Sequence, residues 1–320
     1  MPRRLHLLTF SHCPASTCPG LDEFYGHMAA RSLVFENHYL QRPFAKCPFE
    51  ALGADTSFTR LHASVATGGM SVRTVLISDA CEAATPQLPE WLNVSLVAGD
   101  GADGVVGLSN EHVAQLRNAD FSWVHAVLPA DAGTEQLSHL VTQAEQIASD
   151  AQDVLVVTFL SGGAVCKPDR FQTLLFEGDV RVPLWIRSPH PPCRIQTLTG
   201  SLDIPATMAD LLDASDRDLS APDAVDGAAD LLRIAENPGS QQDRRLFVNA
   251  GAATAIRTPD FLFAQTGAER DAVSALYAKP EDVWNVNDVS AEYHEVVEEL
   301  ENLVRQAGLC DDGAALSGSG

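Results

Sequence analysis

A cysteine with charged neighbours lies near the N-terminus, in the stretch FENHYLQRPFAKCPFEALG at residues 35–53. Lys46 directly precedes Cys47, and a nearby ammonium group lowers the pKa of a thiol and favours the nucleophilic thiolate. Glu50 follows three residues on, and no histidine adjoins Cys47 in the sequence to serve as a base. We therefore interpret Cys47 first as a structural thiol and, as the alternative, as a reactive one.

Soft metal ligands occur repeatedly in the N-terminal part of the chain. His12, Cys13, Cys18 and Cys47 carry the imidazole and thiol groups that suit zinc. Structural zinc sites commonly pair their ligands about two to four residues apart, and the spacing here fits no such signature. A zinc site is therefore the weaker alternative, and no metal is expected.

A glycine-rich stretch, GDGADG at residues 99–104, matches the Gly-x-Gly-x-x-Gly pattern of dinucleotide-binding turns. It follows the strand-like SLVA, and Asp120 lies downstream. The sequence VVGLS after it is typical of a strand rather than a helix, and Asp100 and Asp103 would repel a pyrophosphate. We interpret the stretch as a tight acidic turn. A nucleotide-binding enzyme is the weaker alternative, and we expect no cofactor.

The composition excludes several classes of partner. The chain has 320 residues, a net charge of -22 at pH 7 and only three lysines, Lys46, Lys167 and Lys279. Nucleic acids and acidic membranes are bound through clustered lysine and arginine, so neither is an expected partner. No apolar stretch reaches the length of a membrane span.

The cysteines and the N-terminal residues indicate a cellular compartment. Seven cysteines are spread widely over the chain. The N-terminal apolar run LHLLTF is too short for a secretory signal and reads as a first buried strand. We therefore expect a cytoplasmic protein with free thiols, in which Cys13 and Cys18 form no disulfide.

Apolar runs alternate with helical periodicities over the first two thirds of the chain. Runs such as VLVVTF lack the alternation of a half-exposed strand and are typical of strands buried on both faces. Strands are predicted at residues 5–10, 33–39, 73–78, 94–98, 121–127, 153–159 and 182–187. Helices are predicted at residues 21–32, 109–119, 133–151 and 201–214. This order predicts an α/β sandwich with a mostly parallel central sheet.

The pattern changes after about residue 215. The polar stretch at residues 213–230 is typical of a surface connection. Short strands are then predicted at residues 245–249, 254–258 and 261–265, followed by an amphipathic helix at residues 290–308. We expect a core domain at 1–215, a C-terminal α+β lobe packed on it at 216–310, and a flexible tail at 311–320.

Five motifs in the second half occur in a recognisable order. They are FEGDVRVPLWIRSP (176–189), SLDIPATMADLLD (201–213), VDGAADLL (225–232), TAIRTPDFLFA (254–264) and ALYAKPEDVWNVND (275–288). In this order they resemble the second half of sulfatases of the alkaline phosphatase superfamily, and LHLLTFS and SVRTVLIS fit the first half. The resemblance covers nearly the whole chain and implies an alkaline-phosphatase-like α/β/α sandwich with a small C-terminal α+β lobe.

The resemblance also implies where the chemistry of this family would lie. Sulfatases hold a divalent cation with oxygen ligands and use a cysteine matured to formylglycine as nucleophile. The two adjacent aspartates that end the first strand correspond here to His12 and Cys13. The cysteine of the Cys-x-Pro-x-Arg motif corresponds to Ala45, and a motif that starts at Cys47 would lack both the proline and the arginine.

Four further positions of the family differ in the same way. The lysine of a Gly-Lys pair after the third strand corresponds to Asp79, whose carboxylate would repel a sulfate ester. Two metal ligands after VLVVTF correspond to Ser161 and Gly162, and a last lysine corresponds to Gln172. The resemblance therefore implies the fold of a sulfatase without retained catalytic or metal-binding positions.

These positions predict a sulfatase-like pseudoenzyme that uses its scaffold for binding. Its partner would be an unknown protein or small-molecule ligand. The alternative is an active sulfuric or phosphoric ester hydrolase with a rebuilt site that uses His12, Cys13 or Cys47, so whether the chain is an enzyme stays open. We expect His12, Cys13, Ala45, Asp79, Ser161 and Gly162 to lie together where the strands end.

Overall fold

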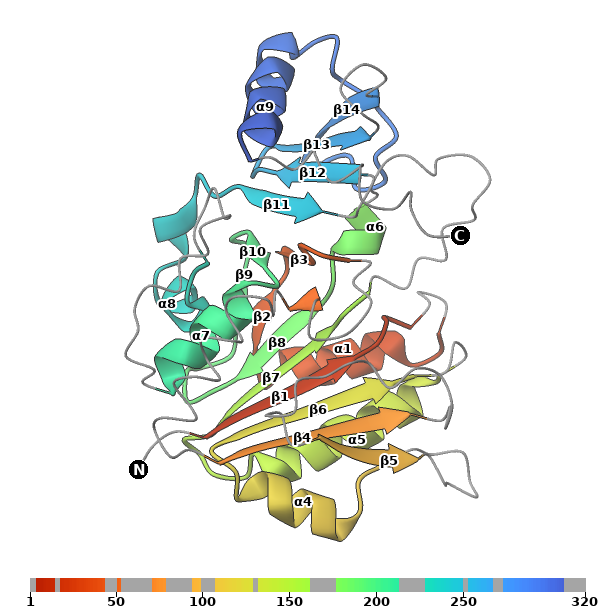
Figure 1. The fold of residues 1–320 in the computed structure, drawn as a ribbon, viewed down its shortest axis with the longest axis vertical. Helices are drawn as coiled ribbons and strands as arrows, with labels where there is room; N and C mark the ends of the chain where they lie inside the picture. The colour runs from red at the N-terminus through yellow and green to blue at the C-terminus, as the bar shows by residue number, and fades with distance from the viewer. Residues whose placement is uncertain are drawn as a thin grey trace, which may run out of the picture.

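Three β-sheets, of eight, four and two strands, organise the described part of the chain (Figure 1). The computed structural model describes residues 4–14, 18–43, 51–52, 71–78, 94–98, 107–128, 132–161, 177–212, 228–249, 253–266 and 273–307. Within these ranges no helix is both long and apolar enough to cross a membrane.

The large sheet has eight strands in the order β5-β4-β6-β1-β7-β8-β2-β9. Their bounds are β1 (Leu5–Phe10), β2 (Leu33–Phe35), β4 (Val72–Ser78), β5 (Val94–Ala98), β6 (Phe121–Val127), β7 (Val154–Phe159), β8 (Leu184–Arg187) and β9 (Cys193–Ile195). Strand β8 runs antiparallel to β7 and β2, and the other pairings are parallel. This confirms the predicted α/β fold with a mostly parallel central sheet.

The central strand β1 is buried along its whole length, which explains why its sequence LHLLTF does not alternate apolar and polar residues. It pairs in parallel with β6 and β7, with Leu5 opposite Phe121 and Val154. Leu5 and Leu7 enter the hydrophobic core on one face of the sheet, and Leu8 enters the core on the other face. A strand whose two faces are both covered has no reason to alternate apolar and polar residues.

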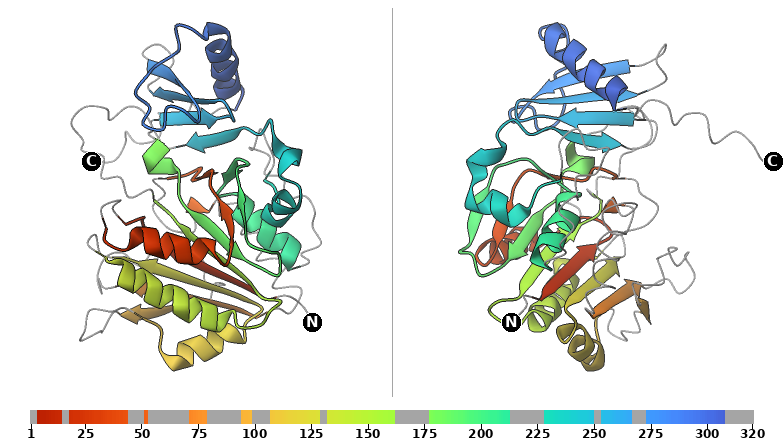
Figure 2. Two further views of the ribbon diagram at one scale, coloured as in Figure 1. Left: turned by 180° about the vertical axis from the view of Figure 1, so that it is seen from behind. Right: turned by 60° about the vertical axis from the view of Figure 1, so that its left-hand side comes forward.

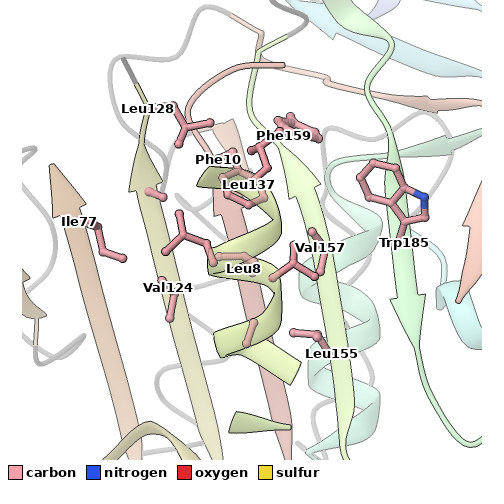
Figure 3. Close-up of a cluster of buried hydrophobic side chains, with 14 of the residues drawn as sticks. Leu8, Phe10, Ile77, Val124, Leu128, Leu137, Leu155, Val157, Phe159 and Trp185 are labelled. Atoms are coloured by element: carbon pink, nitrogen blue, oxygen red, sulfur yellow. The ribbon is translucent and has the colours of Figure 1, made fainter. Parts of the chain in front are cut away.

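Three helices lie across one face of the large sheet, as the left view of Figure 2 shows. They are α1 (Leu21–Ala29), α4 (Asn110–Arg117) and α5 (Thr134–Ile147). Their apolar stripes pack on Leu8, Phe10, Val124 and Val157, which lie on neighbouring strands (Figure 3). The rings of Phe10 and Phe159 stack with centroids 5.1 Å apart. This core fixes the ends of β1 and β7 relative to each other.

Helix α4 begins with a side-chain cap that offers a test of the fold. The Ser109 hydroxyl accepts a hydrogen bond from the backbone N–H of His112 at 3.2 Å. Ser109→Ala is expected to lower the free energy of unfolding by about 1 kcal/mol, because one N–H at the helix start loses its acceptor. Urea unfolding measures the change. Ser109→Asp, which keeps an acceptor, should stay within about 0.3 kcal/mol of wild type, and equal losses in both variants would contradict the cap.

The opposite face of the large sheet is covered by α7 (Asp203–Leu211) and α8 (Leu231–Glu236). Asp203, at the start of α7, is fully buried and forms an ion pair with Arg244, which is 2% exposed in its side chain. The Asp203 carboxylate also accepts from the backbone N–H of Gly200 at 2.7 Å and of Ala229 at 2.9 Å. This one side chain therefore joins three chain segments that are far apart in sequence.

The C-terminal part forms a four-stranded antiparallel sheet with one helix packed on it (Figure 1). Its elements are β11 (Leu246–Asn249), β12 (Ala253–Arg257), β13 (Phe261–Thr266), β14 (Val273–Ala278) and α9 (His294–Gln306). Leu300 and Val304 of α9 pack on Ile256 and Phe263. Strand β14 was not predicted, although its last four residues, ALYA, begin the motif at residues 275–288.

The predicted strand at residues 33–39 is wrong as a single element. The chain turns at Glu36 and Asn37, and the Asn37 side-chain amide donates to the carbonyl of Gln196 at 2.6 Å. After this turn β3 (His38–Tyr39) leaves the large sheet and pairs with β10 (Thr199–Gly200). Short α6 (Glu177–Val180) and the 3-10 helix η2 (Pro238–Gln241) complete the described elements.

Candidate functional site

The carboxyl ends of the parallel strands lie along one edge of the large sheet (Figure 1). Phe10 of β1 pairs with Ala126 of β6 and Phe159 of β7, and Ser78 of β4 pairs with Val127 of β6. Ligands of open α/β sheets bind at this edge, because the loops that follow the strands meet there. We call it the carboxyl edge.

The chain after β1 keeps close to its neighbouring strands at the carboxyl edge. The backbone N–H of Ser11 donates to the carbonyl of Ala126 at 2.9 Å. The backbone N–H of Cys13 donates to the carbonyl of Ser161, also at 2.9 Å. The Ser11 hydroxyl accepts from the N–H of Leu128 at 3.0 Å and lies 2.9 Å from Nδ1 of His12. The structure thus brings His12, Cys13 and Ser161 to one place, and Ser11, which we did not single out from the sequence, orients the imidazole.

The thiol of Cys13 points into the protein rather than toward solvent. The residue is 7% exposed and belongs to the same apolar cluster as Leu21 and Phe24 of α1. Burial raises the pKa of this thiol well above its usual range, so it stays protonated at neutral pH. A protonated thiol is neither a metal ligand nor a nucleophile.

The sequence alternative of a zinc site is not assembled by the described residues. Cys13 and Cys18 are both free thiols, and the nearest acceptors of the Cys18 thiol are the carbonyls of Pro19 and Ala132 at 3.9 Å. In the part of the chain that the structure describes, no three His, Cys, Asp or Glu side chains are placed to hold a metal. Cys47, the fourth suggested ligand, lies outside the described residues.

Several other positions singled out from the sequence also lie outside the described residues. These are Ala45, Asp79, Gly162, Gln172 and the GDGADG stretch at 99–104. The structure therefore places only three of the positions that correspond to the family's site. Asp79 directly follows Ser78, and Gly162 directly follows Ser161. Both serines are described and lie at the carboxyl edge.

Buried histidines form polar contacts inside the large sheet that sequence reasoning did not anticipate. At its opposite edge, His6 Nδ1 lies 2.8 Å from the Ser122 hydroxyl, and His6 Nε2 lies 3.7 Å from the Asp153 carboxylate. The residue types are those of a Ser-His-Asp triad, but all three residues are buried in the protein interior. Burial, followed by nearby Arg4 and Arg187, lowers the pKa of His6 to about 4. The imidazole is therefore neutral, and the group lies in the core without access for a substrate.

A second buried histidine lies nearer the carboxyl edge. Nδ1 of His125 lies 2.9 Å from the Thr9 hydroxyl, which also accepts from the indole N–H of Trp123 at 2.8 Å. Burial lowers the pKa of His125 to about 3, so the imidazole is neutral.

A charged cluster joins the large sheet region to the C-terminal sheet. Glu177 of α6 accepts a hydrogen bond from the Tyr39 hydroxyl and forms an ion pair with the fully buried Lys279 ammonium. Arg257 Nε donates to the Tyr39 oxygen at 3.0 Å, and Lys279 also donates to the Asn285 side chain. The scarcity of lysine was the one sequence signal that could have pointed to Lys279. The cluster is enclosed, so we assign it a structural role.

Sequence comparison alone does not classify the chain: no family model matches it, and no curated protein does. Solved structures do match over nearly its full length. The chain is similar to Ps i-CgsB, solved in complex with k-i-k-neocarrahexaose, at a TM-score of 0.66 and 12% identity, covering 98% of this chain and 94% of that chain. It is similar to a phosphonate monoester hydrolase from Silicibacter pomeroyi at a TM-score of 0.62 and 11% identity, covering 98% and 97%.

A third match is a sulfatase, PsFucS1 from Pseudoalteromonas sp., at a TM-score of 0.56 and 12% identity, covering 97% of this chain and 91% of that one. Together the matches show that the chain has an α/β fold like that of structures from the alkaline phosphatase superfamily. More narrowly, this fold is sulfatase-like, as its sequence motifs imply. Identities of this size establish the fold alone.

Proposed function

We infer that the chain is a sulfatase-like protein without hydrolase activity, which binds a protein or small-molecule ligand at the carboxyl edge. The observation that carries this proposal is the state of Cys13. At a position where the related enzymes have a metal-binding carboxylate, the chain has a buried thiol that is protonated at neutral pH. His12 and Ser161 beside it supply no carboxylate either. A calcium ion needs about six oxygen ligands, several of them carboxylate.

Turnover assays test this proposal directly. The purified protein is incubated with para-nitrophenyl sulfate, para-nitrophenyl phosphate and para-nitrophenyl phenylphosphonate. Each reaction is run with and without millimolar calcium or magnesium. We expect no release of nitrophenol above the buffer rate. We also expect no rise in melting temperature with calcium, because an ion that binds only the folded state would raise it. A rise in melting temperature with a sulfate ester that is not hydrolysed would support a binding role for the carboxyl edge.

The second candidate is an active ester hydrolase with a rebuilt site. The observation that favours it is the fold, since the similar structures include a sulfatase and a phosphonate monoester hydrolase that are covered almost completely. Turnover that is lost in His12→Ala, Cys13→Ala or Cys47→Ala would establish this candidate and exclude the first. Cys193→Ala is the matched control, because Cys193 is an exposed thiol on β9.

A further inference from the structure

A groove lies beside α1, over the strands at one end of the large sheet. Its volume is about 620 Å³. Tyr25 and Gly26 of α1 form one wall, and Val34, Trp185 and Arg194 contribute from β2, β8 and β9. The three helices on this face run side by side (Figure 2), and α1 is the last of them before these strands. None of His12, Cys13 and Ser161 lines the groove, so it is separate from the site on which the proposed function rests.

One half of the groove is aromatic and held rigidly. The rings of Tyr25 and Trp185 have centroids 5.3 Å apart. Trp185 also packs edge-on against Phe24 at 6.0 Å and Phe159 at 6.1 Å, which fixes the position of its indole on the floor. Gly26 leaves the space above the helix open, because a Cβ there would meet nothing within 4 Å. A flat apolar group fits such a wall better than a branched or charged one.

The other half of the groove is polar and contains two arginines. Arg194 forms an ion pair with Glu36, and the Gln196 amide donates to the same carboxylate, so Glu36 is neutralised. Arg181 donates through Nε to the backbone carbonyl of Glu36 at 2.9 Å. The carboxylate nearest to its guanidinium is that of Glu177, at 3.7 Å.

Arg181 forms an ion pair with Glu177 at 3.7 Å, but it shares this carboxylate with two other groups. Glu177 is already bound by the Lys279 ammonium and the Tyr39 hydroxyl, and the side chain of Arg181 is still 37% exposed. Asp22, the remaining carboxylate of the groove, lies in the first turn of α1. In a chain with 43 acidic and 21 basic residues, a part-exposed arginine whose only carboxylate partner among the described residues is shared with a lysine keeps part of its charge for an anionic ligand.

From this arrangement we propose that the groove binds a small organic anion with a flat apolar body. Its negative group lies against Arg181 and its ring lies along Tyr25. Burial raises the pKa of the Tyr25 hydroxyl, so this phenol stays neutral and can donate a hydrogen bond to the ligand.

Two fluorescent probes test the site in the full-length protein. Anilinonaphthalene sulfonate carries a negative charge, and N-phenylnaphthylamine has the same aromatic body without it. We expect saturable binding of the anionic probe at one site per chain. Arg181→Gln should weaken the anionic probe about tenfold, because a charge-assisted contact is lost, and should change the neutral probe less than twofold. Arg233→Gln, at an exposed arginine on α8, is the matched control and should change neither.

A second variant blocks the groove without touching its charges. Gly26→Leu fills open space on α1 and replaces a glycine in a helix interior, so the fold should be kept or stabilised. We expect it to weaken both probes at least tenfold. The proposal is overturned if Gly26→Leu binds the anionic probe like wild type, or if Arg181→Gln, with an unchanged circular dichroism spectrum, weakens both probes equally or neither.

Discussion

Acidification from neutral pH to about pH 4 is expected to destabilise the protein steeply. Burial lowers the pKa of His6 and His38 to about 4 and that of His125 to about 3, against an ordinary value of 6.5. The unfolded chain therefore takes up protons between pH 6.5 and about 4 that the folded chain does not. The free energy of unfolding therefore keeps its full value above pH 6.5. It decreases as the pH falls, by up to about 1.4 kcal/mol per pH unit for each histidine.

Urea unfolding at a series of pH values measures this loss. His125→Asn, which keeps a hydrogen-bonding group for Thr9, should reduce the slope of unfolding free energy against pH by about 1.4 kcal/mol per unit in this window. His139→Asn, at an exposed position of α5, should leave the slope unchanged. An identical slope in wild type and His125→Asn would show that His125 is not held neutral by burial.

Arg244→Met is expected to lower the free energy of unfolding by about 3–5 kcal/mol. The substitution leaves the fully buried Asp203 carboxylate without its cation, and two backbone N–H groups cannot compensate the lost charge. The effect should appear as a lower urea midpoint with an unchanged slope, since the same surface becomes exposed on unfolding.

The neighbouring residue supplies a matched control. Arg245 pairs with Glu299 at 2.7 Å, but both side chains are at least one third exposed, so Arg245→Met should cost less than about 1 kcal/mol. The double variant Asp203→Asn with Arg244→Met should cost less than the sum of the single variants, because no charge is left buried. Additive losses would mean that the two side chains do not stabilise each other.

The sequence located every strand of the large sheet except β9, because those strands are marked by their own composition, whereas two of the three residues of β9 are exposed. VLVVTF is apolar at every position except Thr158, and the structure buries all six residues of β7. The helix predicted at residues 201–214 corresponds to α7, which the structure places at Asp203–Leu211. Strand β3 could not be predicted from its two residues, since it exists only because Thr199 and Gly200 pair with it from far along the chain.

Part of the candidate site could be predicted from the sequence for the same reason. His12, Cys13 and Ser161 could be located because each follows a strongly apolar strand. The burial of Cys13 could not, because it depends on α1 packing over it. Likewise, nothing in the sequence around His6 or His125 indicates a partner, since Ser122 and Thr9 are each 116 residues away from the histidine that they contact. Arg181 and Tyr25 are still farther apart in the sequence and line one groove only in the folded chain.

The contact between Glu177 and Lys279 also governs how the chain can be divided. Tyr39, Val180 and Leu198 share one apolar cluster with Val248 and Leu262 of the C-terminal sheet. A fragment ending before β11 would open this cluster to water and leave Glu177 without its ammonium partner. Recombinant work on the N-terminal part therefore has to retain residues through α9, and a protease cut between the two sheets should release no stable N-terminal half.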